Sequence, residues 1–301
     1  MPVNIYQEFI SCQSSFVYFV ENYVKIANPI KGDTPFVLYP YQKRLIETLG
    51  KNKFILVKKF RQGGFTTLAL IYSLWKCLFH SDQHFYFVSK SEGEAIHLGK
   101  YISKIMDAFP SWFVKPTKNT QNEKAFITES TISFGIMEGV RGRCLTNLVI
   151  DEAAFIPGMN EKWKLIWNLP HLPNVGPSGP SVLVISTVNG PVNWFCDVWT
   201  GAIEGKNNFL PFSADYWEHP DYNSAEWVAQ MKAQLGEKGF MQEVLGEFVI
   251  DRPEFDTAQF VNLDKHDLIQ KSLRILELSK LKFQDKALIY EMIHRFASGS
   301  A

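Results

Sequence analysis

Residues 59–67 combine two cations, a glycine pair and two threonines between an apolar run and a long apolar segment. A strand, a glycine-containing loop and a helix that begins in the threonine pair are the parts of a phosphate-binding loop. In such a loop, backbone N–H groups cradle the phosphates. The usual motif has a lysine before the threonine, but Phe65 stands there. Lys59 and Arg61 are the candidate phosphate-binding cations, and the alternative is a surface turn that caps a helix.

The acidic pair Asp151-Glu152 directly follows the apolar run 148–150. In nucleotide hydrolases, the first carboxylate after such a strand holds magnesium and the second polarises the attacking water. This pattern predicts that Asp151 and Thr66 are metal ligands and that Glu152 is the catalytic base. An exposed loop in which carboxylates are common is the alternative.

A third apolar run ends in Ser186-Thr187, and Asn189 begins a turn shortly after it. Hydroxyl groups beside a terminal phosphate can register whether that phosphate is present. Hydroxyl residues are also frequent turn formers, which on its own favours a plain turn. Because this cluster follows the phosphate loop and the acidic pair along the chain, we interpret it as functional.

Apolar runs alternate with helical patterns along the chain. This alternation predicts an α/β fold with a mainly parallel sheet flanked by helices. The expected helical segments are 6–27, as one amphipathic helix or two, 41–49, 66–79 and 92–109. The expected strands are 53–58, 84–89, 147–150, 182–185 and 208–212, with a hairpin over 125–136. Because ligands bind at the carboxyl ends of parallel strands, we expect the three polar clusters to meet there.

The composition sets limits on the class of protein. The chain has 301 residues, 46% of them apolar and 21% charged, which is typical of globular proteins. Its 31 basic and 31 acidic residues give no net charge, which excludes a uniformly basic nucleic-acid coat protein. The four cysteines form no CxxC motif, and no segment reads as a signal peptide or membrane span. These features predict a cytosolic protein with reduced cysteines.

With these motifs in this order, the sequence resembles the ATPase half of the large terminase subunit of tailed bacteriophages, the motor that packs DNA. The resemblance runs from about residue 9 to residue 250. Segment 32–42 resembles the adenine-recognition segment of the family, with Gln42 as its glutamine. Lys59 matches a family variant that carries the lysine at the start of the loop, and Arg61-Gln62 matches an Arg-Gln pair of the family.

The resemblance implies a P-loop NTPase fold of the RecA-like (ASCE) type with Mg²⁺-dependent ATP hydrolysis. It implies Glu152 and Arg61 as catalytic residues and Ser186, Thr187 and Asn189 as a coupling motif. The implied ATP-binding residues are Gln42, Lys59, Arg61, Gln62, Gly63, Gly64, Phe65, Thr66 and Thr67. Either Arg141 or Arg143, in segment 139–143, would be an arginine finger offered to a neighbouring subunit.

The same resemblance predicts an ATPase domain over residues 1–250, with a small lid subdomain formed roughly by 1–35 and 208–250. Residues 251–301 are expected to be a helical extension or linker, so nuclease activity is not expected in this chain. The implied partners are double-stranded DNA, the portal protein and the small terminase subunit. The chain is expected to form a homo-oligomeric ring on the portal, with a monomer in solution as the alternative, in the cytoplasm of the infected cell and away from membranes.

Two other interpretations stay open. A helicase or another P-loop NTPase would share the first two motifs, but a helicase needs a second RecA-like domain, for which the chain after residue 250 is too short. A nucleotide-binding homologue whose catalysis has decayed would be consistent with Phe65.

Overall fold

The computed structural model describes residues 4–28, 32–167 and 180–249. The extension predicted for 251–301 lies outside the described residues. Within them, no helix is long and apolar enough to cross a membrane.

An eight-stranded sheet forms the centre of the structure, with the strand order β10-β3-β9-β8-β4-β7-β6-β5. The six strands from β10 to β7 are parallel, whereas β6 and β5 are antiparallel additions at one edge. The strand bounds are β3 Phe54–Lys58, β4 His84–Val88, β5 Lys118–Asn119, β6 Glu123–Ala125, β7 Thr131–Gly135, β8 Asn147–Asp151, β9 Ser181–Ser186 and β10 Leu210–Ser213. The predicted α/β class is therefore confirmed.

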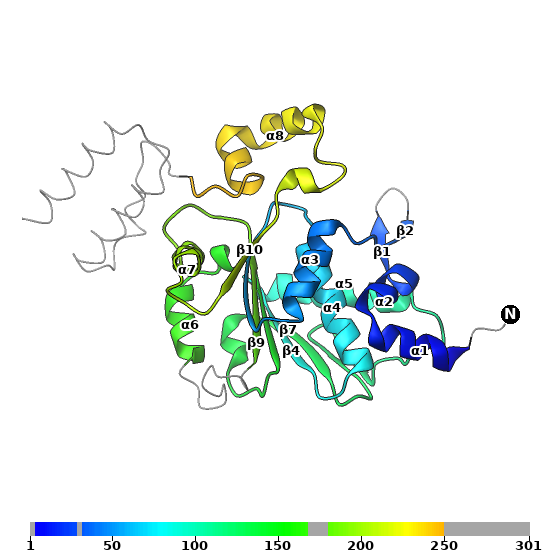
Figure 1. Cartoon of the computed structure of the whole chain (residues 1–301). Coiled ribbons are helices and arrows are strands. Elements are labelled where there is room, and N and C mark those ends of the chain that lie inside the picture. The colour runs from blue at the N-terminus through cyan, green and yellow to red at the C-terminus, as the bar shows by residue number, and fades with distance from the viewer. Residues whose placement is uncertain (1–3, 29–31, 168–179, 250–301) are drawn as a thin grey trace, which may run out of the picture.

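Helices cover both faces of this sheet, with α6 and α7 on one side and α3, α4 and α5 on the other (Figure 1). Their bounds are α3 Pro40–Leu49, α4 Phe65–Phe79, α5 Glu92–Asp107, α6 Met159–Trp167 and α7 Trp194–Ile203. Short 3-10 turns cover Met137–Val140, Ala153–Phe155 and Tyr216–Glu218. Because helices bury both faces, the central strands are apolar along their whole length, and Leu56, Val57 and Ile150 are at most 1% exposed.

The N-terminal segment packs on the main core. The structure divides the predicted helical segment 6–27 into α1, Ile5–Ser14, and α2, Phe16–Tyr23, because the Ser15 side chain caps the second helix. A two-stranded ribbon follows, β1 Lys25–Asn28 with β2 Gly32–Pro35. The Phe16 ring lies 5.6 Å from both the Tyr72 and Trp75 rings of α4.

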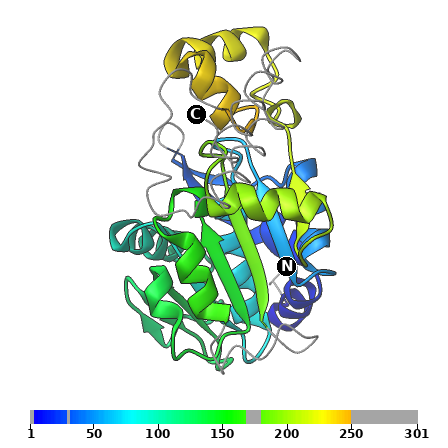
Figure 2. The ribbon, with the colours of Figure 1, turned by 90° about the vertical axis from the view of Figure 1, so that its left-hand side faces the viewer.

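The predicted lid joins residues 1–35 to 208–250, and this division of the chain stays a prediction. Helices α1 and α2 contribute to the same core cluster as α4, and β10 pairs with β3 in the main sheet. Helix α8, Ala225–Glu243, lies beyond the carboxyl edge of the sheet (Figures 1 and 2). Gly236 interrupts this helix with a φ of 69° and a ψ of 169°, so α8 is two helical pieces joined at a kink.

Stacked aromatic rings hold the start of α8 near the sheet. The Tyr222 ring stacks on His219 at 3.8 Å and on Trp227 at 4.5 Å. The Tyr39 ring, before α3, lies 4.5 Å from His219, and the Phe60 ring lies 6.1 Å from Tyr222. This stack connects the α8 segment to both α3 and the loop after β3.

Candidate active site

The three polar clusters meet at the carboxyl edge of the sheet, because β3, β9 and β8 are parallel neighbours. Strand β9 lies between the other two, so the Ser186 end is flanked by Lys58 and by Asp151. Two direct side-chain contacts connect the phosphate loop and the first turn of α4 to the acidic pair. Lys59 Nζ lies 2.6 Å from Glu152 Oε1, and the Thr66 hydroxyl donates to Asp151 Oδ1 at 2.9 Å.

The loop between β3 and α4 is held by two side chains of α3. Tyr41 Oη donates a hydrogen bond to the Gly63 carbonyl at 2.8 Å, and Gln42 Nε2 donates to the same oxygen at 3.2 Å. Gly64 has a φ of +73°, and a Cβ there would stand 2.8 Å from Gln42 Nε2. Glycine is therefore required at Gly64 by both its backbone and its neighbour.

Phe65, which replaces the usual lysine, points into the core and is 1% exposed. Its ring lies 5.4 Å from Tyr41 and 6.0 Å from Phe60. The ring therefore packs beneath the loop and leaves the space above it clear. Thr66 and Thr67 follow in the first turn of α4, whose free N–H groups point toward that space.

Two of the four groups in direct contact are buried, whereas Thr66 and Glu152 are partly exposed. Lys59 and Asp151 are each 8% exposed. Burial raises the pKa of Asp151 to about 6, and the Glu152 charge acts in the same direction, whereas Lys59 and the Thr66 hydroxyl oppose the rise. Asp151 thus has the Thr66 hydroxyl and a second carboxylate, Glu152, beside it. A bound cation would therefore stabilise this site.

Two residues of the site adopt the left-handed backbone conformation that only glycine adopts freely. Gln62 has a φ of 61° and Glu152 a φ of 52°. Such conformations cost about 1–3 kcal/mol each and concentrate at functional sites. Glu152 Oε2 is also buried, and within the described residues it has no hydrogen-bond partner. One oxygen of this carboxylate is thus engaged by Lys59 and the other is available to a ligand or water.

The predicted coupling residues hold the chain that follows Glu152. The Ser186 hydroxyl accepts a hydrogen bond from the Ala154 N–H at 3.1 Å, and Asn189 Nδ2 donates to the Ala154 carbonyl at 3.3 Å. The Ser186 carbonyl accepts from the Lys59 N–H at 3.0 Å. Thr187, next in the chain, is 3% exposed. Ser186 therefore joins the phosphate loop to the acidic loop.

The phosphate loop also contacts the region around α8. The Arg61 N–H donates to the Glu243 carbonyl at 2.8 Å, while the Arg61 side chain is exposed. Lys58 Nζ donates to the Gly246 carbonyl at 3.0 Å and lies 5.2 Å from the Trp199 ring. Burial lowers the pKa of Lys58.

The Gln42 amide is hydrogen-bonded inside the protein, whereas a contact with adenine requires a free amide. Its Oε1 accepts from the Tyr39 N–H at 3.1 Å, its Nε2 donates to Gly63, and the residue is 1% exposed. Both ends of the amide are therefore used inside the protein. Adenine recognition by Gln42 stays a prediction.

The two candidate finger arginines differ in how firmly they are held. Arg143 donates to the Gly139 carbonyl at 2.9 Å and to the Ser133 hydroxyl at 3.3 Å, and its guanidinium lies 4.9 Å from the Tyr86 ring. Arg141 is exposed, and its charge contributes to lowering the pKa of Glu138. Both arginines are exposed, and Arg143 is the one that side-chain hydrogen bonds hold to its own sheet region.

Sequence reasoning missed two contributors to the site, Tyr41 and Lys58. Tyr41 and Lys58 each adjoin a predicted site residue, but nothing in the sequence indicates which neighbour they contact. Within the described residues, no group of three or more His, Cys, Asp or Glu side chains could hold a metal ion.

A parallel sheet with a glycine loop, a hydroxyl at the start of the next helix and an acidic pair on a nearby strand defines the P-loop NTPase fold. The family described as "Terminase large subunit, T4likevirus-type, N-terminal" matches residues 59–260. The chain therefore belongs to the terminase large subunit family.

Solved structures of phage terminases have the same fold. The large terminase ATPase domain of Thermus phage P74-26 is 18% identical, with a TM-score of 0.53 over 71% of this chain and 95% of that chain. The large terminase of bacteriophage HK97 is 14% identical, with a TM-score of 0.58 over 77% of this chain and 54% of that one. The large terminase of a thermophilic bacteriophage, in complex with ADP, is 14% identical with a TM-score of 0.53, and the match covers 71% of this chain and 54% of that one.

Proposed function

We propose that this chain is an ATP-hydrolysing motor domain that drives double-stranded viral DNA into a procapsid. The observation that carries the proposal is the pair of contacts Lys59–Glu152 and Thr66–Asp151 at the carboxyl edge of a P-loop NTPase sheet. The family match and the ADP complex of the thermophilic-phage relative support nucleotide binding by this chain.

The residues fit a magnesium ion bound together with the triphosphate. Mg²⁺ prefers oxygen ligands and is commonly held by one or two protein groups together with substrate phosphates. The Thr66 hydroxyl and Asp151 supply such oxygens, and the partnerless Glu152 Oε2 lies at the next residue. When bound, the ion would neutralise charge on the phosphates.

In the proposed mechanism, backbone N–H groups of the loop and the first turn of α4 bind the phosphates. The terminal phosphate replaces Glu152 as the partner of Lys59. This exchange frees the Glu152 carboxylate to orient and deprotonate the attacking water. Arg61, whose side chain is exposed at the loop, adds positive charge to the phosphates. Gln42 recognises adenine in this proposal once the contacts of its amide open.

Loss of the terminal phosphate would return Lys59 to Glu152. Ser186 and Asn189 are bonded to Ala154, two residues after Glu152, so they sense the position of the acidic loop. The hydrogen bond between the Arg61 N–H and the Glu243 carbonyl passes movement of the phosphate loop to α8. We propose α8 and its flanking turns as the lid that moves DNA.

The partners of the proposal are double-stranded DNA, the portal protein and the small terminase subunit, in the cytoplasm of an infected host cell. Several copies would form a ring on the portal, with Arg141 as the trans finger. Because the chain spans only 54% of the HK97 protein and of the ADP-bound thermophilic-phage protein, we assign no nuclease function to it.

The test is Mg²⁺-dependent ATP hydrolysis by the purified chain alone, with double-stranded DNA and with single-stranded DNA. We expect hydrolysis that double-stranded DNA stimulates most. Stronger stimulation by single strands would favour a helicase-like enzyme. ATP binding without any hydrolysis, even with DNA and at high protein concentration, would favour a decayed homologue.

A further inference from the structure

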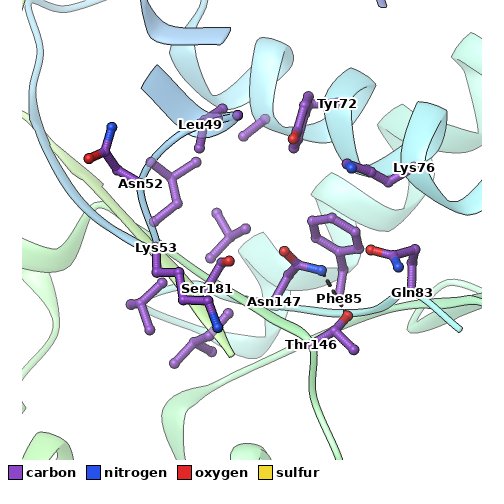
Figure 3. Close-up of a pocket in the computed structure, with 16 residues that line it drawn as sticks. Leu49, Asn52, Lys53, Tyr72, Lys76, Gln83, Phe85, Thr146, Asn147 and Ser181 are labelled. Atoms are coloured by element: carbon purple, nitrogen blue, oxygen red, sulfur yellow. Dashed lines mark hydrogen bonds between the residues drawn. The ribbon is translucent and has the colours of Figure 1, made fainter. Parts of the chain in front are cut away.

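A second feature of the structure lies at the opposite edge of the sheet, where the central strands begin. A cavity of about 270 Å³ opens there between the sheet and helices α3 and α4 (Figure 3). Its lining includes Leu49, Tyr72, Lys76, Gln83, Asn147 and Ser181. The volume is close to the lower end of the roughly 300–1,000 Å³ of small-molecule sites.

The cavity is separate from the phosphate site. Thr66 and Lys76 are ten residues apart on α4, which corresponds to about 15 Å along the helix axis. Strands β8 and β9 likewise begin at the cavity and end at the acidic and coupling residues, and a five-residue strand spans roughly 17 Å. A ligand in the cavity would therefore not touch bound nucleotide.

The walls supply an apolar slot with one aromatic side. Phe85, Val149 and Leu183 line it from β4, β8 and β9, and all three belong to the main core cluster. On the helix side, Ala69 and Tyr72 are one turn apart on the same face of α4. A flat apolar body of few atoms matches this lining.

The charged side chains of the lining are all positive. Two lysines, Lys53 and Lys76, contribute to it, and none of the lining residues is acidic. Lys76 Nζ lies 5.3 Å from the Trp75 ring and 5.9 Å from the Tyr72 ring. Within the described part of the chain, no carboxylate is within ion-pair distance of Lys76. Its pKa is lowered by burial, so a charge is partly withdrawn from water without a counterion.

Polar groups at the starts of the strands face Lys76 across the cavity (Figure 3). The Asn147 amide donates to the Thr146 hydroxyl at 2.8 Å, which fixes the orientation of its carbonyl oxygen. Ser181, at the start of β9, adds a hydroxyl. The lining thus has an apolar middle, with Lys76 on the helix side and Lys53, Asn147 and Ser181 on the strand side (Figure 3).

We propose that this cavity binds a small organic acid, with its anionic group at Lys76 and a flat apolar body against Phe85, Val149 and Leu183. The anion would give the half-buried ammonium the counterion that it lacks, and the body would fill the apolar slot. This proposal does not depend on the proposed motor function.

Benzoate and its neutral analogue benzamide are suitable probes, because they share size and shape and differ in charge. The whole chain, labelled at its Leu and Val methyl groups, would be titrated with each while NMR spectra are recorded. We expect saturable benzoate shifts at Leu49, Val149 and Leu183, and binding of benzamide weaker by about tenfold or more. This comparison uses the wild-type chain and needs no variant to fold.

The matched variants are Lys76→Gln and Lys104→Gln, the latter on the exposed surface of α5. Lys76→Gln should weaken benzoate binding about tenfold and leave benzamide binding unchanged, while Lys104→Gln should change neither. Equal affinity for the two probes, a lack of saturable shifts, or shifts confined to Val57 and Val188 at the carboxyl edge would overturn the proposal.

Discussion

Lys59 and Arg61 are the two cations of the phosphate loop, and their environments differ. Lys59 is 8% exposed with its ammonium at Glu152, whereas the Arg61 side chain is exposed and only its backbone is bound to Glu243. A cation already in the site loses less entropy when it holds a phosphate. Lys59 is therefore expected to be the essential cation and Arg61 an auxiliary one.

Binding of ATP-γ-S, which carries a terminal phosphate, to Lys59→Ala and Arg61→Ala, measured by isothermal titration calorimetry, tests this assignment. Loss of a charged hydrogen bond costs about 1.5–3 kcal/mol, so Lys59→Ala should weaken binding roughly 10- to 150-fold. Arg61→Ala should weaken it less. Lys51→Ala, at an exposed residue before β3, serves as the control. A larger loss in Arg61→Ala than in Lys59→Ala would reverse the assignment.

At the scale of elements, the turn between β3 and α4 depends on Gly64. Gly64→Ala introduces both a left-handed alanine and a clash with Gln42 at 2.8 Å, whereas Gly205→Ala introduces only the left-handed alanine, at a φ of 69°. We expect Gly205→Ala to lower the free energy of unfolding by about 1–2 kcal/mol. Gly64→Ala should lower the free energy of unfolding by more than this and should also abolish ADP binding.

Urea denaturation of both variants, followed by circular dichroism, measures these differences. If Gly64→Ala were no less stable than Gly205→Ala, the contact between Gln42 and the loop would not constrain the turn. Retained ADP affinity in a folded Gly64→Ala chain would contradict the role of this turn in phosphate binding.

Helix α8 depends on the aromatic stack at its start. The Trp227 ring stacks on Tyr222 at 4.5 Å and on Tyr216 at 5.6 Å, whereas Trp217 is 54% exposed. Trp227→Ala should therefore speed amide hydrogen exchange across α8 by about tenfold or more, since an aromatic pair contributes about 0.5–1.5 kcal/mol beyond its buried area.

Exchange in β8 and β9 should change little, and Trp217→Ala should leave α8 as in the wild type. Uniformly faster exchange throughout the Trp227→Ala chain would mean that α8 and the sheet unfold together. In that case α8 would be part of the core instead of a lid.

Much of the site was predictable because its polar residues stand at the ends of apolar runs. That pattern alone predicted that Lys59, Thr66, Asp151 and Glu152 would meet, and the structure brings them together. The contact of Arg61 with Glu243 was not predictable, since it joins backbone groups about 180 residues apart and leaves no mark on the side chains. The sequence left open one helix or two over 6–27, and it did not place the break at Ser15 because helical spacing continues through that residue.

The order of β3, β9 and β8 could not be predicted from the sequence pattern, for a related reason. Each strand is apolar on both faces, so its sequence indicates burial and not which strands are its neighbours. The packing of α1 and α2 on α4 was likewise not predictable, because helical spacing indicates that a helix has a buried face and not which element covers it.

At the scale of the whole molecule, our proposal is that Arg141 of one subunit completes the site of the next. An arginine finger supplied in trans contributes about 10³–10⁵ to phosphoryl transfer. Arg141→Ala should therefore lose turnover and keep ADP binding. Arg143, bonded to Gly139 and Ser133, is expected to matter for folding, so Arg143→Ala should mainly lower the melting temperature.

Mixing Arg141→Ala with Glu152→Gln subunits, on the portal or at high concentration, distinguishes a finger in trans from one in cis. A Glu152→Gln subunit still offers Arg141 to its neighbour, so part of the ATPase activity should return in the mixture. Two inactive variants that stay inactive together, while wild-type chain is active under the same conditions, would contradict a shared site.

The central claim is that Glu152 activates water for ATP hydrolysis, and the most direct test compares Glu152→Gln with the wild type. Glu129→Gln is a matched control, because Glu129 is outside the site and also has a left-handed backbone, with a φ of 58°. The measurement is ATP turnover together with ATP affinity for each chain. We predict that Glu152→Gln loses about 10²–10⁴-fold in turnover and keeps its ATP affinity, with Glu129→Gln unchanged. Wild-type turnover in Glu152→Gln would contradict the role assigned to this carboxylate.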